Sequence, residues 1–218
     1  MIGPSSWPRT LRLDVRLGGV TVGYRDPPAV VVLAAGESSR MRGEDKLLRE
    51  IDGTPLILRA VRAACAVSAH VVVTLPPGPQ RAAWLTDLPA RRVVVPERTM
   101  SASIGAGVRA SRPGAVLLHL ADMPEIGAED LHALCDAWRD ASAPILRAAA
   151  ADGTPGHPVI FDAGLRARLQ SLQGDVGARD VLRAHPVELQ RLPGRRALVD
   201  LDTPEEWAIW MAGRVGSI

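Results

Sequence analysis

The sequence predicts an α/β fold, in which helices cover both faces of a mostly parallel sheet to give a three-layer αβα, Rossmann-like sandwich. Strand-like and helix-like segments alternate from about residue 30 onward, which is typical of a parallel sheet with crossover helices. Several of the strand-like segments, such as Val71–Leu75, are apolar throughout, as expected for strands buried on both faces. The 218 residues, 47% of them hydrophobic, suit one domain with a sizeable core.

The predicted elements follow in order. In the first part of the chain, short apolar runs predict strands and three-to-four-residue apolar spacing predicts helices. The strands are expected at 30–33, 71–75, 93–95 and 115–120, and the helices at 55–66, 80–85, 101–110 and 128–140. Ser101 or Ser103 is expected to cap the helix over 101–110.

The second part of the chain is less regular. Strands are expected at 145–150, 158–161, 187–192 and 197–201, with a helix at 176–184. A last helix should begin at Thr203-Pro204-Glu205-Glu206, because Thr suits the N-cap, Pro the first helical position and Glu the third.

The domain boundaries follow from composition. Residues 1–28 carry Pro4, Pro8, Pro27 and Pro28 and are expected to form an N-terminal extension, either an added edge strand or a segment outside the core fold. Residues 29–213 are expected to form the single domain and 214–218 a frayed tail. Cys65 and Cys135 stand alone in apolar helical contexts, which favours buried free thiols over a disulfide or metal site.

Charge and hydropathy exclude several classes of partner. A net charge of +2 is too small for a nucleic-acid or membrane-surface partner, and 3% aromatic residues argue against base-stacking platforms. The chain lacks an apolar run of membrane-spanning length and a signal-peptide apolar region, so a cytoplasmic location is expected.

The segment Val30–Lys46 indicates a phosphate-binding loop. A buried strand ending at Leu33 leads into small residues, Ala34, Ala35 and Gly36, whose backbone amides can approach a polyphosphate. Ser38, Ser39, Arg40 and Lys46 follow and add donors and cations. A tight turn with solvated charges fits the same pattern equally well. A Walker A loop does not fit, because no Gly-Lys-Ser/Thr follows.

Two aspartates follow predicted strands. Asp122 comes after the strand at 115–120, where open α/β sheets bind ligands, and a carboxylate there can hold Mg²⁺. Asp202 follows the strand expected at 197–201. A turn-forming aspartate and a helix-capping aspartate, respectively, are the structural alternatives.

The helix over 101–110 contains Gly105-Ala106-Gly107-Val108-Arg109-Ala110, which satisfies G-x-G-x-x-A. A dinucleotide loop requires a strand-to-loop junction, and these glycines lie inside a helical stretch. They are expected to permit close packing on the sheet or on a nucleotide. Ser101 and Ser103 precede them and can donate to a phosphate or base.

The residues Leu33, Ala34, Ala35, Gly36, Ser38, Arg40, Met41, Gly43 and Lys46 match, in order, the pattern LAAGxSxRMGxxK. The segment therefore resembles the MobA-like nucleotidyltransferases, with one departure: Arg42 is an extra residue. The resemblance implies a fold of the nucleotide-diphospho-sugar transferase type. It also implies catalytic roles for Arg40, Lys46 and Asp122, metal binding by Asp122 and Asp202, and nucleotide contacts from Leu33–Gly36, Ser38, Ser39, Ser101, Ser103 and Gly107.

Two further blocks are similar to the cytidylyltransferase branch of this family, Gly156-His157-Pro158 and Leu172-Gln173-Gly174-Asp175-Val176-Gly177-Ala178-Arg179. By this resemblance Gly156, His157, Gly174 and Asp175 contact the second substrate, although a lone histidine in a turn is more often structural. Ala35 supports CTP, because the guanylyltransferase branch usually has Gly there.

The implied reaction joins CTP to molybdopterin bearing molybdenum, with Mg²⁺, and gives the cytosine dinucleotide cofactor and pyrophosphate. A client molybdoenzyme is a further expected partner. Transfer to a sugar or isoprenoid phosphate, or from another nucleotide, remains open within the same chemistry. A non-catalytic molybdopterin-binding maturation factor is the alternative of another class, and a nicotinamide-dependent enzyme would rest on the G-x-G-x-x-A match alone.

Overall fold

A seven-stranded sheet in the order β5-β4-β1-β6-β8-β7-β9 forms the centre of the molecule. The computed structural model describes residues 25–97, 99–174 and 177–215. The strands are β1 (Ala29–Leu33), β4 (Val71–Leu75), β5 (Ala90–Val94), β6 (Val116–Leu120), β7 (Ile145–Ala149), β8 (Pro155–Phe161) and β9 (Val187–Arg191). β8 pairs antiparallel with β6 and β7, whereas the other pairings are parallel, so the predicted mostly parallel sheet is confirmed.

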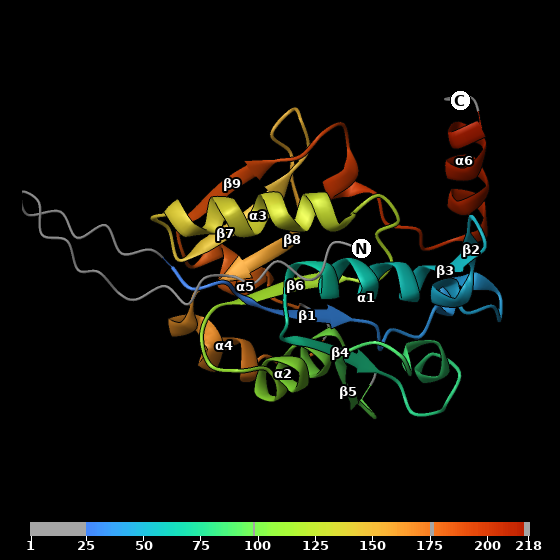
Figure 1. Ribbon diagram of the computed structural model, residues 1–218, viewed down its shortest axis with the longest axis horizontal. Coiled ribbons are helices and arrows are strands. Elements are labelled where there is room, and N and C mark those ends of the chain that lie inside the picture. Colours follow the sequence, from blue (N-terminus) through green and yellow to red (C-terminus); the bar gives the residue numbers. More distant parts are fainter. Residues whose placement is uncertain (1–24, 98, 175–176, 216–218) are drawn as a thin grey trace, which may run out of the picture.

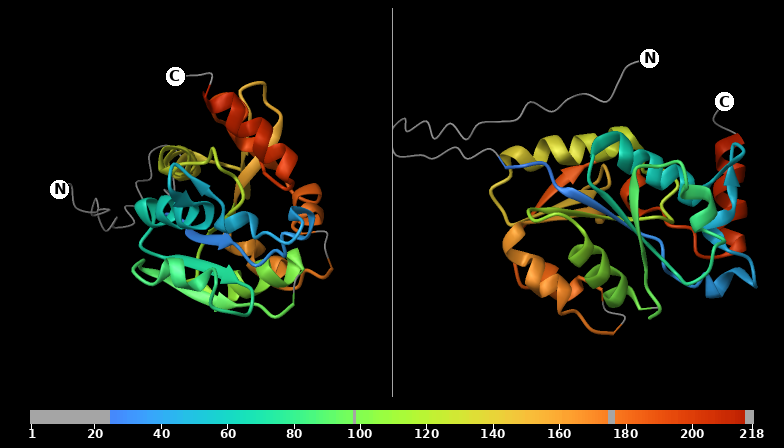
Figure 2. Two further views of the ribbon diagram at one scale, coloured as in Figure 1. Left: turned by 90° about the vertical axis from the view of Figure 1, so that its right-hand side faces the viewer. Right: turned by 60° about the horizontal axis from the view of Figure 1, so that its bottom comes forward.

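Helices cover both faces of this sheet (Figures 1 and 2). α1 (Leu56–Val67) and α3 (Ala128–Asp140) lie on one face, and α2 (Met100–Ala110), α4 (Arg166–Gln170) and α5 (Arg179–Arg183) lie on the other. α6 (Pro204–Val215) stands at one end, beside the short hairpin of β2 (Glu50–Ile51) and β3 (Thr54–Pro55). The three-layer αβα arrangement predicted from the alternating pattern is therefore confirmed.

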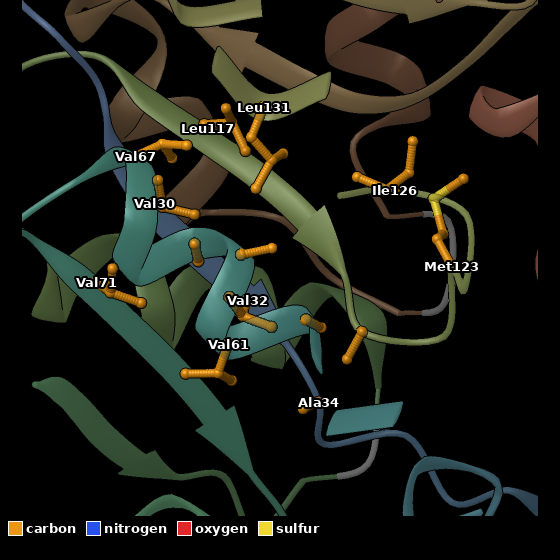
Figure 3. Packing of buried hydrophobic residues seen from close by; sticks show 14 of the residues in the cluster. Val30, Val32, Ala34, Val61, Val67, Val71, Leu117, Met123, Ile126 and Leu131 are labelled. Atoms are coloured by element: carbon orange, nitrogen blue, oxygen red, sulfur yellow. The ribbon is translucent and has the colours of Figure 1, made fainter. Parts of the chain in front are cut away.

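Two apolar cores fill the spaces between the layers, and β1 contributes to both. Val30 and Val32 face the α1 and α3 side, where they pack near Val61 and Val67 of α1 (Figure 3). Val31 faces the α2 side. Every β1 residue is buried, so its run of β-branched residues is explained by burial on both faces.

The predicted bounds hold within a few residues for most elements, with two exceptions. The strand expected at 197–201 is instead a 3₁₀ turn, Arg196–Leu198, because Ala197 packs against Gly156 of β8 and does not join the sheet. The helix expected at 176–184 is shorter, Arg179–Arg183, and Gly177 before it has φ 60°. The 80–85 segment is a 3₁₀ helix, Ala82–Leu85.

The expected domain boundaries remain predictions, because most of both chain ends lies outside the described residues. Of the predicted extension over 1–28, residues 1–24 lie outside the described residues; Arg25 stacks 4.1 Å from the centre of the Trp138 ring. Arg214 and Val215 extend α6 beyond the predicted boundary, and Arg214 donates to Asp52 at 2.6 Å. Cys65 and Cys135 are free, and Cys135 is buried. Within the described ranges, none of the helices is long and apolar enough to cross a membrane.

Candidate active site

A cleft of about 350 Å³ lies at the carboxyl ends of β1 and β6. These strands are adjacent and parallel, so the loop after Leu33 and the aspartate after Leu120 emerge at the same edge of the sheet. The predicted residues that line the cleft are Leu33, Ala35, Gly36, Ser38, Ser39, Arg40, Lys46, Ser103, Asp122 and Asp202. The structure thus brings together side chains up to 169 positions apart in the sequence, from Leu33 to Asp202.

Lys46 is the centre of the charge network in this cleft. Its Nζ donates to Asp122 Oδ2 and to Asp202 Oδ1, both at 2.5 Å. Burial by itself would lower the pKa of Lys46, but the charges and hydrogen bonds of the two aspartates outweigh it and raise that pKa. Lys46 therefore stays charged in a site where a polyphosphate can replace a carboxylate as its partner.

The extra residue Arg42 does not displace Lys46. Arg42 adopts a left-handed conformation with φ 54°, and its Nη2 donates to Glu205 Oε1 of α6 at 2.5 Å. The insertion is therefore directed toward α6, and Lys46 still reaches both aspartates. Arg40 is 70% exposed and donates to Asp202 Oδ2 at 2.6 Å, so it faces solvent at the mouth of the cleft.

The start of α6 holds Asp202 in place. Glu206 Oε2 accepts from the backbone nitrogens of Asp202 and Thr203, and Thr203 Oγ1 accepts from the Glu206 nitrogen. This is the capping box predicted from the sequence. Burial would raise the pKa of Asp202, but the hydrogen bonds and charges of Lys46 and Arg40 lower it. Asp202 is thus an anion that faces the cleft from a rigid helix start.

The carboxylates of the cleft fit a hard divalent cation. Asp122 Oδ1 is buried and has no hydrogen-bond partner, which leaves one oxygen ready for a ligand. A third carboxylate, Asp200, also lines the cleft, and burial together with the charges of Asp122 and Asp202 raises its pKa. No group of three or more His, Cys, Asp or Glu side chains in the described part of the chain could form an all-protein metal cage. Two carboxylates completed by phosphate oxygens is the usual pattern for Mg²⁺.

Arg81 organises the loop, and sequence reasoning missed it. Its side chain is 4% exposed and forms a two-pronged ion pair with Asp45 at 2.6 and 2.8 Å. Its Nη1 also donates to the Ala34 carbonyl at 2.6 Å. Asp45 in turn accepts from the Leu47 nitrogen at 3.0 Å, next to Lys46. The sequence signal that could have indicated Arg81 is its position after β4, which pairs parallel with β1 and so ends at the same edge of the sheet.

α2 contributes less to the cleft than predicted. Thr99, not Ser101 or Ser103, caps the helix, with Oγ1 accepting from the Ala102 nitrogen at 3.1 Å. Ser103 lines the cleft, whereas Ser101 is buried outside it. The predicted nucleotide contact of Gly107 is not supported, because a Cβ there would lie 2.3 Å from Val31 Cγ1. Gly107 instead permits close packing of α2 on the sheet. The Ala34 side chain, also predicted to contact the nucleotide, is buried in the core on the α1 and α3 side.

A second cavity of about 680 Å³ adjoins the cleft and shares Leu33, Met100 and Leu120 with it. β8 is antiparallel, so its beginning, with His157, lies at the edge where β6 ends. His157 lines this cavity, and its pKa is lowered to about 4 by burial and by the charge of Arg147, against the opposing charge of Asp122. His157 is therefore neutral and lines the second cavity.

The other predicted second-substrate residues differ from His157. Gly156 packs against Ala197, where a Cβ would lie 1.9 Å from the Ala197 carbonyl oxygen, and does not line the cavity. Gly174 forms an exposed turn with φ 68°. Asp175 lies outside the described residues. Gly177, Ala178 and Arg179 from the same sequence block do line the cavity.

Comparison with known proteins identifies relatives of different activities. The chain is 36% identical to 2-C-methyl-D-erythritol 4-phosphate cytidylyltransferase of Streptomyces coelicolor, over 72% of this chain and 67% of that protein. It is 34% identical to molybdenum cofactor guanylyltransferase of Burkholderia vietnamiensis, over 50% and 57% respectively. It is also 29% identical to nicotine blue oxidoreductase of Paenarthrobacter nicotinovorans, over 85% and 98%.

Solved structures agree with the fold. Rv0371c of Mycobacterium tuberculosis in complex with manganese superposes with a TM-score of 0.71 at 25% identity, covering 86% of this chain and 99% of that chain. The CTP complex of CMP:2-keto-3-deoxy-manno-octonic acid synthetase has the same fold, with a TM-score of 0.69 at 13% identity. The family model of the MobA-like NTP transferase domain matches residues 30–189. This range includes the loop after β1, Asp122, and the parallel strands β4, β5 and β6. The chain therefore belongs to the MobA-like NTP transferase family of nucleotidyltransferases.

Proposed function

We propose that this protein transfers a cytidylyl group from CTP to the phosphate of molybdenum-loaded molybdopterin, with Mg²⁺ as cofactor. The observation that carries the proposal is the junction of two cavities. A cleft with Lys46, Arg40 and two aspartates suits a triphosphate, and it opens at Leu33 and Leu120 into a separate, larger cavity. This arrangement suits a reaction between a nucleotide and a second organic substrate.

The chemistry needs little acid–base catalysis. An acceptor phosphate oxygen, already anionic at neutral pH, attacks the α-phosphorus of CTP and forms the new P–O bond. The bond from the α-phosphorus to its bridging oxygen breaks, and pyrophosphate leaves with that electron pair. Lys46 and Arg40 neutralise the phosphate charge and help to hold the groups in line. Asp122 and Asp202 would hold Mg²⁺, which supplies further charge neutralisation when it is bound.

The choice of nucleotide and acceptor rests on local residues and on relatives. Ala35 lines the cleft, and we infer that its methyl group leaves less space for a purine than a glycine would. Two relatives support the choice: 2-C-methyl-D-erythritol 4-phosphate cytidylyltransferase supports a cytidylyl donor, and molybdenum cofactor guanylyltransferase supports a molybdenum cofactor acceptor. His157 and the 177–179 segment line the second cavity, and both belong to blocks similar to the cytidylyltransferase branch.

Transfer of a cytidylyl group to a polyol phosphate is a second candidate, favoured by the 36% identity to the cytidylyltransferase of Streptomyces coelicolor. A nicotinamide-dependent reaction is disfavoured by the site. The G-x-G-x-x-A match lies within α2, and Gly107 is pressed against Val31 of β1. It is therefore not a loop that opens toward a dinucleotide.

The test is pyrophosphate release by the purified protein with Mg²⁺. Each of CTP, GTP, ATP and UTP is paired with molybdenum-loaded molybdopterin and, separately, with 2-C-methyl-D-erythritol 4-phosphate. The proposal expects release with CTP and molybdopterin, and loss of release in Lys46→Met. Release with GTP would overturn the choice of nucleotide, and release with the polyol phosphate alone would establish the second candidate. Molybdopterin binding without release from any nucleotide would favour a carrier.

A further inference from the structure

Arg147 is a cation of the second cavity that has no counter-ion among the residues the structure describes. It lies on β7 opposite Val159 of β8 and lines the cavity. Its Nε donates to the Gly156 carbonyl at 2.7 Å and its Nη2 to the Pro155 carbonyl at 3.4 Å. Within the part of the chain that the structure describes, it makes no ion pair with a carboxylate, and Nη1 has no hydrogen-bond partner. The two carbonyls hold the guanidinium in one orientation and leave donors for a ligand.

Partial burial of the Arg147 guanidinium without a paired carboxylate is energetically unfavourable. The residue is half-buried, and burial lowers the pKa of its guanidinium. A desolvated cation without a counter-ion is unfavourable, and an anionic ligand relieves that cost. His157, beside it, has a buried Nδ1 without a hydrogen-bond partner. A guanidinium with one unpaired nitrogen and a buried imidazole nitrogen without a partner thus belong to side chains that line one cavity, as expected for a subsite that a ligand completes.

The remaining lining defines the rest of that ligand. Its polar side chains are Arg147 and His157 on the sheet, with the exposed Arg179 and Arg183 of α5 at the rim. Most of the other described lining residues are apolar: Leu33, Met100, Ile104, Leu118, Leu120, Pro155, Val159, Phe161, Ala178, Leu182, Val187 and Leu189. The described lining includes no Asp, Glu, Asn, Gln, Ser or Thr side chain that would bind the hydroxyl groups of a polyol.

We propose that Arg147 is a specificity-determining residue of the acceptor site, and that it selects an organic anion whose charged group is attached to an apolar or aromatic body. Arg147 binds the anionic group, neutral His157 adds a hydrogen bond, and the apolar floor of Leu118, Val159 and Phe161 receives the body. The inference rests on the proposed function for the identity of this cavity as the acceptor site. Beyond that function, Arg147 recognises the acceptor, and the acceptor is an anion on an apolar or aromatic body.

The test measures binding without turnover. Isothermal titration compares naphthyl phosphate, its uncharged analogue naphthol, and glycerol phosphate as probes, with the wild type and with Arg147→Gln and Arg147→Lys. Arg92→Gln is the matched control, because Arg92 is also a strand arginine but lies exposed on β5, outside both cavities. CTP binding, and thermal unfolding to verify the fold, are measured for every variant.

The wild type should bind naphthyl phosphate more tightly than either glycerol phosphate or naphthol. Arg147→Gln should weaken naphthyl phosphate binding by about 10- to 100-fold, the usual effect of losing a hydrogen bond to a charged group, and should leave naphthol and CTP unchanged. Arg147→Lys should retain part of the affinity, and Arg92→Gln all of it.

Wild-type affinity for naphthyl phosphate in Arg147→Gln would overturn the proposal. If that variant does not fold, equal wild-type affinities for naphthyl phosphate and naphthol, or for naphthyl phosphate and glycerol phosphate, would overturn it. Arg147-dependent binding together with no pyrophosphate release from molybdopterin would leave this subsite in place while the proposed reaction fails. The two proposals are therefore separable.

Discussion

Replacement of Arg81 by Met tests whether the phosphate-binding loop is held by one buried ion pair. The change removes a two-pronged ion pair to Asp45 and a hydrogen bond to the Ala34 carbonyl, and it retains much of the side-chain volume. Breaking a buried pair costs about 3–5 kcal/mol. The Asp45 side chain is 26% exposed and can be partly rehydrated, which reduces the expected loss of unfolding free energy to about 2–3 kcal/mol.

The assay is urea unfolding of the wild type, Arg81→Met, Asp45→Ala and the double variant. Because the two residues contact each other, the losses should not add, and the cycle should give a coupling energy above about 1 kcal/mol. Arg92→Met, an exposed arginine, should stay within about 0.5 kcal/mol of the wild type. CTP affinity should also fall in Arg81→Met, since Asp45 accepts from the Leu47 nitrogen beside Lys46. Additive losses in the cycle and unchanged CTP affinity would refute the reasoning.

Four further predictions follow from the geometry. Asp122→Asn should weaken Mn²⁺ binding, measured by electron paramagnetic resonance, and reduce turnover by roughly 10²–10³-fold while the fold is retained; undiminished Mn²⁺ affinity would remove this carboxylate from the metal site. Lys46→Met should weaken CTP binding by about 10- to 100-fold in titration calorimetry, and an unchanged affinity would place its ammonium away from the phosphates. Gly107→Ala should lower the unfolding free energy by about 1–3 kcal/mol, because its methyl group would lie 2.3 Å from a β1 side chain, and urea unfolding at wild-type stability would contradict this. The pKa values of His119 and His157 are lowered from 6.5 to about 4 in the native state, so their contribution to stability is complete above pH 6.5 and is lost as the pH falls toward 4. Each histidine contributes a slope of roughly 1.4 kcal/mol per pH unit to the unfolding free energy in this range. His119→Leu should remove the contribution of one histidine, and urea unfolding between pH 7 and 5 measures this.

The three-layer fold class was predictable because the local hydrophobic and capping patterns agreed with where each element lies in the structure. The unbroken apolar runs of β1 and β4 already indicate burial on both faces, and Thr203 with Glu206 forms the capping box expected from four consecutive residues. Segments whose structure depends on distant partners were predicted less well. The 197–201 segment has strand-like composition, but its Ala197 packs onto Gly156 and forms a 3₁₀ turn.

In the candidate site, too, residues in local motifs were predictable and contacts between distant segments were not. Gly36, Arg40, Lys46 and Asp122 lie within motifs whose spacing marks them in the sequence, and the structure places them around one cleft. The role of the inserted Arg42 was not readable from the motif, because its ion pair with Glu205 spans 163 positions.

The sequence by itself determined the three-layer αβα class, the family and the edge of the sheet where the site lies, because hydrophobic periodicity and a contiguous loop motif are local properties. Only the tertiary structure decided that Arg81 holds the loop, that Gly107 serves packing, and that Arg147 faces the second cavity. The reason is physical: ion pairing, close backbone approach and desolvation depend on which residues from distant segments meet, and the folding of β8 and β7 beside β6 brings those groups together.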